Sequence, residues 1–428
     1  MRVPDSIVVG IEVEFLAAQH ASDETEKAAT DRRWACEPPS KQPVFGTSPA
    51  IDQAPFAWSE AWALQKGCET LARTGLRTAC PFPTDWVLGN PINDKATSDA
   101  IVLDTDGKTL RVWNTAATDD TVETTDFWFL VKERHISLDL VKYPRSSPSS
   151  RFSFVGIELN SPMLSRPSEF ARGLPTLRKG LTALRENMVL GLNANCGLHV
   201  HVSENGTLSL KTAQRVACLV LMLEDSLLMP ISHPHRHTST YSMRISTESV
   251  VVLAKDRAKM EDLCSDGPVQ IKALGDMMDK LKGRKKVDKR ILHAMMRIYK
   301  ETNITHLGLA LRKFDEGPVH TTTRCALVVT KHNSIEFRYP AATFDADYIS
   351  GWVHLARHIF AMALTLSDKD FSKALCVVYE MVTRDEKVGW ETVMTKGIGF
   401  REVVPEEWKK CMRGFGRDLD KQGILSRS

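Results

Sequence analysis

Short segments of alternating apolar and polar residues recur along the chain and predict its strands. Residues 6–17 (SIVVGIEVEFLA) are β-branched and alternate in polarity, which predicts a strand near the start of the fold. Residues 152–164 (FSFVGIELNSPML) repeat this pattern, and residues 197–203 predict a third strand. Turn residues separate further apolar runs, which predict short strands at 86–89, 100–103, 110–113, 127–131 and 135–141. Residues 324–340 predict a hairpin that turns near His332 and Asn333.

Helical periodicity separates these strands. It predicts helices at 58–73, 167–190, 209–229 and 346–366, and a charged helical region at 255–315. The third of these helices is mostly apolar, but Arg215, Glu224 and Asp225 interrupt it, so we expect it to be buried in the protein rather than to span a membrane. Asp345 is well placed to cap the helix that begins at Ala346.

The order of these elements favours an α+β fold. Strands and helices alternate irregularly, with short turns between strands, which is typical of a mainly antiparallel sheet. We predict a single domain over residues 1–428. Residues 18–57 are polar and rich in Pro, Ala, Ser and charge, so we expect a partly disordered loop insertion there. Residues 341–428 are expected to be mostly helical.

Composition limits the classes of partner and the cellular compartment that we expect for the protein. The 428 residues are 43% hydrophobic and 25% charged, which suffices for a full core. A net charge of +3 gives no strong field, so we expect neither nucleic acid nor a membrane as a partner. The first residues have neither the pattern of a signal peptide nor that of a transit sequence. The nine cysteines are scattered and form no Cys-x-x-Cys pair, which predicts reduced thiols and a cytoplasmic protein.

Candidate chemistry comes from ionisable residues two positions apart in strand-like sequence. Such pairs are Glu12 and Glu14, His199 and His201, and Glu336 and Arg338; Glu158 lies in a similar apolar context. In a strand, residues i and i+2 point to the same face, about 6–7 Å apart. One face of the sheet is therefore expected to carry several carboxylates.

Crowded carboxylates repel one another and need a compensating cation. Oxygen-rich sites with a minority of imidazole suit magnesium, or alternatively manganese, better than zinc. A neighbouring arginine suits phosphate, and metals flanked by arginine stabilise a transferring phosphoryl group. The chain has no P-loop and no convincing dinucleotide fingerprint. Any one of these pairs alone is more often the solvated face of a strand, but several pairs with apolar flanks favour a metal site.

Four segments resemble, in order, the motifs of the amidoligase family: residues 10–15 (GIEVEF), 156–162 (GIELNSP), 196–202 (CGLHVHV) and 334–339 (SIEFRY). That family is placed among the carboxylate–amine ligases related to glutamine synthetase and glutamate–cysteine ligase. The resemblance implies a glutamine-synthetase-like catalytic fold. In it, a curved, mainly antiparallel sheet carries the active site on its concave face, and helices pack on the other face.

The resemblance also implies a set of metal ligands. Residues 197–203 are similar to a segment of glutamine synthetase, which implies metal at His199 and nucleotide contacts at His201 and Ser203. Residues 335–340 are similar to another such segment and imply Glu336 as a ligand. By the same resemblance Glu12 and Glu14 would ligate different metals, and Glu158 would complete one of these sites.

Arginines and a tyrosine complete the implied site. By resemblance Arg338 would contact the transferring phosphate, and Arg324 or Arg236 would hold phosphate or carboxylate. Arg236 and Tyr241 fall where the amidoligases carry an Arg and a Tyr, so both would reach substrate or phosphate. Glutamine synthetase has a second Arg five residues after the one matched by Arg324, whereas Val329 stands here.

These features predict an ATP- and magnesium-dependent ligase that joins a carboxylate to an amine through an acyl-phosphate. Its substrates would be a small carboxylate or amino acid and an amine. One alternative is a phosphotransferase similar to the guanidino kinases, and another is an inactive nucleotide-binding scaffold of the same fold. The oligomeric state is left open.

Overall fold

The computed structural model describes most of the chain. The described residues are 2–27, 29–41, 58–82, 100–103, 109–113, 124–136, 151–253, 289–314, 323–383, 388–417, 419 and 423–427. The strand predicted at 86–89 lies outside them, as do most of the strand predicted at 135–141 and much of the helical region predicted at 255–315.

Ten strands of the described residues form one sheet. They are β1 (Ile7–His20), β2 (Thr78–Phe82), β3 (Ala100–Leu103), β4 (Thr109–Trp113), β5 (Trp128–Lys132), β6 (Phe152–Asn160), β7 (Leu190–Gly191), β8 (Leu198–Glu204), β9 (Leu327–Val329) and β10 (Ile335–Phe337). Their order is β3-β4-β2-β5-β6-β1-β8-β10-β9, and β7 pairs with β1. Each pairing is antiparallel except that of β2 with β5. The predicted α+β fold with a mainly antiparallel sheet is confirmed, whereas the likeness to the glutamine synthetase fold stays a prediction.

The helices are mostly short. They are α1 (Asp23–Lys27), η1 (Pro39–Lys41), α2 (Trp58–Ala72), η3 (Thr124–Asp126), α4 (Pro167–Ala171), α5 (Pro175–Asn187), α6 (Leu210–Leu223), η4 (Glu224–Leu228), α7 (Met229–Ile231), η5 (Pro234–Thr238), α8 (Ile245–Glu248), α9 (Val250–Leu253), α12 (Lys289–Lys300), α13 (Ile304–Ala310), α14 (Ala346–Thr365), α15 (Asp368–Val382), α16 (Trp390–Thr392), η6 (Val393–Gly397) and α17 (Pro405–Gly414). Among the described residues, no helix has both the length and the apolar character to cross a bilayer.

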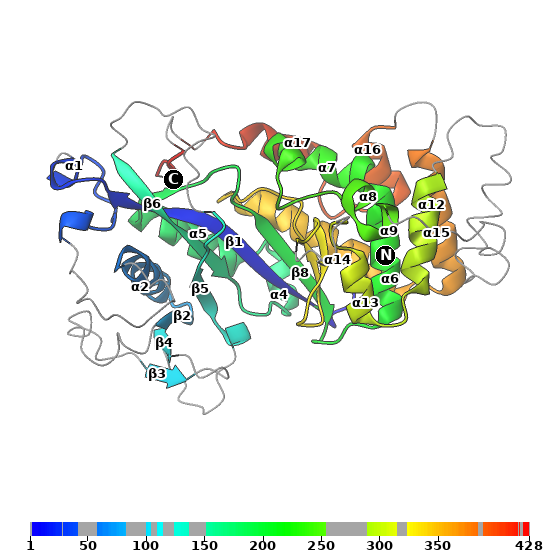
Figure 1. Ribbon diagram of the computed structural model, residues 1–428, viewed down its shortest axis with the longest axis horizontal. Coiled ribbons are helices and arrows are strands. Elements are labelled where there is room, and N and C mark those ends of the chain that lie inside the picture. The colour runs from blue at the N-terminus through cyan, green and yellow to red at the C-terminus, as the bar shows by residue number, and fades with distance from the viewer. Residues whose placement is uncertain are drawn as a thin grey trace.

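Strand β1 organises the two faces of the sheet. Its odd-numbered residues from Ile7 to Phe15 are all buried and belong to the main apolar core. Helix α14 packs against β1 and β8, and α2 packs against β5 and β6. In Figure 1, α5 and α14 lie behind the central strands, while α6, α12, α13 and α15 gather at one end of the molecule. The even-numbered residues of β1, including both glutamates, therefore face the other side.

Two predicted boundaries are corrected by the structure. Strand β1 continues to His20, three residues into the segment predicted as a loop. There the N–H of Ala18 donates to the carbonyl of Val189, and the carbonyl of Ala18 accepts the N–H of Cys36. The helix predicted at 167–190 is two helices, α4 and α5. Gly173 and Leu174 have φ of 65° and 58°, and Pro175 starts α5, where its missing N–H costs nothing.

Other predicted elements are confirmed. Ser209 caps α6, which gives way to the π-turn η4 at the predicted interruption, Glu224. The buried Glu224 carboxylate accepts the Tyr339 hydroxyl at 2.6 Å and two backbone N–H groups. The predicted hairpin forms from β9 and β10, and its turn residue Asn333 has φ of 55°.

Asp345 caps α14 as predicted, since its carboxylate accepts the N–H groups of Asp347 and Tyr348 at 2.9 and 3.2 Å. We expect Asp345→Ala to lower the free energy of unfolding by about 1 kcal/mol, because the helix loses this cap. Asp347→Ala is the control, since it removes only an exposed ion pair with Arg178 and should change stability by less than about 0.5 kcal/mol. Urea denaturation measures both, and equal losses would contradict the assignment of the cap.

Candidate metal centre

The strand register brings the predicted acidic residues together. Glu12 on β1 lies opposite His199 on β8, and Glu14 lies opposite Glu158 on β6. Directly opposed residues of antiparallel strands point to the same face. These four side chains therefore share one face of the sheet, and α14 packs on the opposite face.

The same face continues onto β10. His201 on β8 lies opposite Glu336 on β10, and on its other side it lies opposite Gly10 of β1. Because Gly10 carries no side chain, nothing from β1 separates His201 from Glu12 at this level of the sheet. The three pairs predicted from i, i+2 spacing are thus neighbours across adjacent strands.

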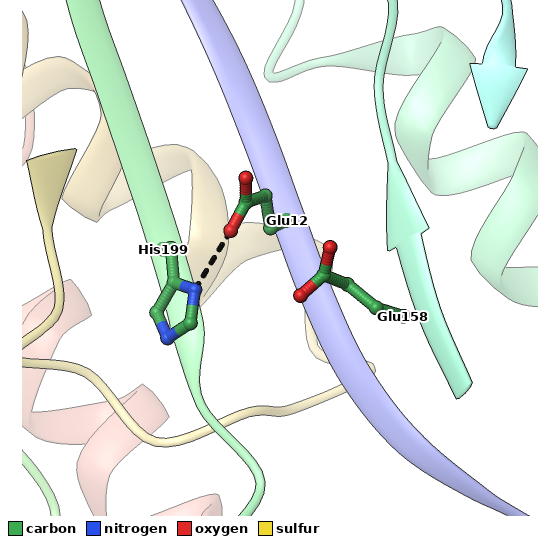
Figure 2. A group of neighbouring side chains, drawn as sticks. All are labelled: Glu12, Glu158 and His199. Carbon is green, nitrogen blue, oxygen red and sulfur yellow. Dashed lines mark hydrogen bonds and ion pairs between the residues drawn. The ribbon is translucent and has the colours of Figure 1, made fainter. Parts of the chain in front are cut away.

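Glu12 is the centre of the group. Its Oε2 lies 2.8 Å from His199 Nδ1, and its Oε1 lies 3.0 Å from His201 Nε2. His199 Nδ1 is also 3.6 Å from Glu336 Oε1, and His199 Nε2 is 3.7 Å from Glu14 Oε1. Figure 2 shows Glu12, Glu158 and His199 extending from three neighbouring strands toward one another. One carboxylate therefore links both imidazoles.

Three combinations of these side chains could each hold a metal ion, since the ligand atoms within each lie within 4.8 Å of one another. They are Glu12, Glu158 and His199; Glu12, His201 and Glu336; and Glu14, Glu133 and Glu158. All five predicted metal ligands are included. His201, assigned to nucleotide by resemblance, lies among the ligand candidates as well.

Glu133 was not predicted. It follows β5, and its N–H donates to the carbonyl of Gly156 at 3.0 Å. A Cβ on Gly156 would lie 2.3 Å from the Glu133 carbonyl oxygen, so only glycine permits this approach. The glycine in the predicted strand was the available signal that another backbone comes close there.

The carboxylates differ in their proton affinity. Burial alone would raise the pKa of Glu12, but His201 and His199 hold it well below its usual range. Burial is likewise opposed at Glu336, where Arg338 and the two histidines lower the pKa. Burial raises the pKa of Glu14, and burial together with the charges of Glu12 and Glu14 raises that of Glu158 well above its usual range. The part of the group at Glu158 on β6 therefore has too little positive charge to compensate its carboxylates.

This arrangement fits a divalent cation. His199 is 2% exposed, and its buried Nε2 has no hydrogen-bond partner among the described residues. Burying an unpartnered polar atom or an uncompensated carboxylate costs free energy, and a cation bound to these atoms would remove both costs. Five carboxylates and two imidazoles favour magnesium or manganese over zinc.

Arg338 lies beside the acidic group. Its Nη1 is 2.5 Å from Glu336 Oε1, and its Nε donates to the carbonyl of Tyr241 at 3.4 Å. Arg324 is more peripheral, because its side chain is 56% exposed and its Nη1 lies 3.9 Å from Glu336 Oε2. Both arginines thus contact the same carboxylate.

Arg236, Tyr241 and Ser203 lie around this group. Arg236 is fully buried, and its Nη2 donates to the carbonyl of Arg338 at 2.8 Å. In this structure its guanidinium therefore binds the backbone of Arg338. The Tyr241 hydroxyl donates to the carbonyl of His135 at 3.3 Å. Ser203 is buried two residues beyond His201, opposite Val8. Of these three, Arg236 and Tyr241 place Arg338.

A family model described as "putative amidoligase enzyme" matches residues 97–360, more than half of the chain. The chain belongs to the amidoligase family. Searches of curated proteins and of solved structures gave no match. The matched range of this amidoligase contains Glu158, His199 and Glu336, whereas Glu12 and Glu14 precede it and join the group through strand pairing.

Gly197 provides a test of the candidate metal centre of this amidoligase. Its N–H donates to Glu14 Oε2 at 2.6 Å, and an added Cβ would lie 2.7 Å from His199 Nε2 and 3.2 Å from Glu14 Oε2. Gly197→Ala should therefore displace two ligands and weaken Mn²⁺ binding about tenfold or more, as followed by electron paramagnetic resonance. Gly414→Ala, at the end of α17, is the control, because no atom lies within 4 Å of its added Cβ. Equal effects of the two substitutions would contradict this geometry.

Metal binding should release protons. Because the pKa of Glu158 is raised, this carboxyl keeps its proton to a higher pH than usual, and a cation must displace that proton to bind there. Affinity for Mg²⁺ is therefore expected to rise with pH through the raised pKa. Calorimetry in buffers of different ionisation enthalpy counts the protons released. Glu158→Gln should release fewer protons, and an unchanged count would contradict this assignment.

Proposed function

We propose that this amidoligase is an ATP- and magnesium-dependent ligase that joins a carboxylate to an amine through an acyl-phosphate. The observation that carries the proposal is the group of Glu12, Glu336, His199 and His201 on one sheet face, with Arg338 against Glu336. Membership of the amidoligase family supports a ligase. Acidic ligands beside an arginine suit the charge of a triphosphate and of a phosphoryl group in transfer.

The cation would be held by the three combinations of ligands described above. Bound magnesium would neutralise the phosphate oxygens of ATP and orient the γ-phosphoryl group. His201 would contribute to cation binding through its 3.0 Å contact with Glu12, in addition to the nucleotide contact implied by resemblance. We assign Ser203, further along the same face of β8, to the nucleotide.

The residues of the chain would act mainly by positioning. A substrate carboxylate oxygen attacks the γ-phosphorus and the bond to ADP breaks, which gives the acyl-phosphate. The amine then attacks the acyl carbon, loses a proton and releases phosphate. Arg338, fixed by Glu336 and by the Tyr241 carbonyl, would donate to the phosphoryl oxygens in both steps. Arg324 is exposed enough to reach a substrate carboxylate.

The role of Glu336 is testable by measuring ATP-dependent amide formation and phosphate release together. We expect Glu336→Ala to lower coupled turnover by about a hundredfold or more, because both a ligand and the partner of Arg338 are lost. Glu204→Ala, at the partly exposed end of β8, is the control. Unchanged coupled turnover in Glu336→Ala would refute the assignment.

Product analysis separates ligation from phosphotransfer. A ligase leaves an amide and free phosphate, whereas a phosphotransferase leaves a stable phosphorylated product. Mass spectrometry of reactions with amino acids and small amines distinguishes these outcomes. A phosphorylated product without amide would replace the proposed function by phosphotransfer.

We also propose a cytoplasmic location. Five cysteines of the described residues are free and buried: Cys36, Cys80, Cys196, Cys218 and Cys325. Disulfides are the usual state of paired cysteines in oxidising compartments, so free buried thiols favour a reducing one.

A further inference from the structure

A cavity of about 350 Å³ lies between α5, the start of α14 and the end of α17. It is separate from the metal centre. The ring of Phe344, which lines the cavity, meets Phe15 edge to face at 5.7 Å. Phe15 belongs to the apolar face of β1, opposite to the face that carries Glu12 and Glu14. The cavity therefore lies on the helical side of the sheet.

The cavity has an excess of positive charge. Arg178 and Arg185, seven residues apart on α5, line one side, and the exposed Arg417 lines another. The acidic residue of the lining is Asp345, whose carboxylate is already bonded to two N–H groups of α14. Both side chains of the ion pair between Arg178 and Asp347 are exposed, so the pair is weak and a bound anion could replace Asp347 as the partner of Arg178. An anion would be attracted here.

An aromatic wall lies beside these arginines. Tyr348 and Phe415 both line the cavity, with ring centroids 6.1 Å apart in an edge-to-face contact. Phe415 also stacks on His233 at 4.1 Å, and the Tyr348 hydroxyl donates to the carbonyl of Ile231 at 3.1 Å. Both rings are therefore fixed from behind. Pockets of this size with an apolar wall and a few charged groups suit small organic ligands.

We propose that this cavity binds a small organic anion, with its carboxylate or phosphate group against the arginines and its apolar body against Tyr348 and Phe415. Both anions offer oxygens that guanidinium groups bind in the same way, so the arginines do not distinguish them. The site is additional to the proposed ligase site, because none of its lining residues belongs to the metal centre.

The chain segment that lines this cavity is also hydrogen-bonded to β8 and to the residues just before it, on the sheet face that carries the candidate metal ligands. Thr343 and Phe344 line the cavity, and just before them Ala342 donates its N–H to the carbonyl of Cys196. Leu198 in turn donates to the carbonyl of Pro340 at 3.1 Å. Gly197, between these two anchor points, holds Glu14. A ligand in the cavity thus contacts a segment bonded to the strand of both histidines.

The test is equilibrium dialysis of the full chain with phenyl phosphate, benzoate and benzyl alcohol, in chelator and without ATP. We expect at least one of the two anions to bind, and benzyl alcohol, which has the ring without the charge, to bind at least about tenfold more weakly. Arg417→Gln and Arg178→Gln should each weaken the anion about tenfold, since each removes a charged contact. Arg172→Gln, an exposed arginine of the same region outside the cavity, should leave binding unchanged.

The outcomes are decisive in both directions. Binding of phenyl phosphate alone supports a phosphorylated ligand, and binding of benzoate alone supports a carboxylate. Failure of both anions to bind at millimolar concentration overturns the proposal, as does equal affinity in Arg417→Gln and Arg172→Gln. Glu336→Ala should retain binding, so a failed ligase assay and a failed cavity assay are separate results.

Discussion

The contact of Glu12 with both histidines of β8 is the interaction on which the rest of the site depends. A carboxylate at the middle of a ten-stranded sheet loses most of its hydration, and an unpaired charge there would cost several kcal/mol. His199 and His201 supply that compensation from the neighbouring strand. Because the register fixes which residues oppose Glu12, the pairing of β1 with β8 determines both the stability and the chemistry of this face.

Charge compensation is uneven across the sheet. Glu12 and Glu336 have basic partners that keep their pKa low. At Glu14, burial outweighs His199 and Arg338, and Glu158 meets burial together with the charges of Glu12 and Glu14. Glu133 adds one more acid on that side. A divalent ion would remove this imbalance, since the ligand atoms already lie within 4.8 Å of one another. The fold thus holds these acids together at a cost in free energy, which cation binding would offset.

Sequence periodicity predicted the parts of the site that depend on local geometry. The i, i+2 spacing placed each pair of ionisable residues on one face, and the turn at Asn333 and the cap at Asp345 follow from residue preferences within a few positions. Which strands lie side by side depends on contacts between distant segments, so spacing alone could not place Glu12 against His201. Glu133 was missed because it follows a strand end and approaches through space left by Gly156. The break before Pro175 was missed because helical periodicity continues across it.

Buried contacts to the backbone connect the sheet face that carries the candidate metal ligands with the opposite face, on which the helices pack. Arg236 is completely buried and donates to the carbonyl of Arg338. It lies on η5, three residues after His233, whose ring stacks on Phe415. Burial lowers the pKa of Arg236 to about 10, so its charge is kept at neutral pH although its Nε and Nη1 have no partner among the described residues. Moving the Arg236 guanidinium would cost free energy, because the acids that compensate its charge, such as Glu14, are themselves fixed in position. The backbone of Arg338 and the aromatic wall of the cavity are therefore held by the same short turn.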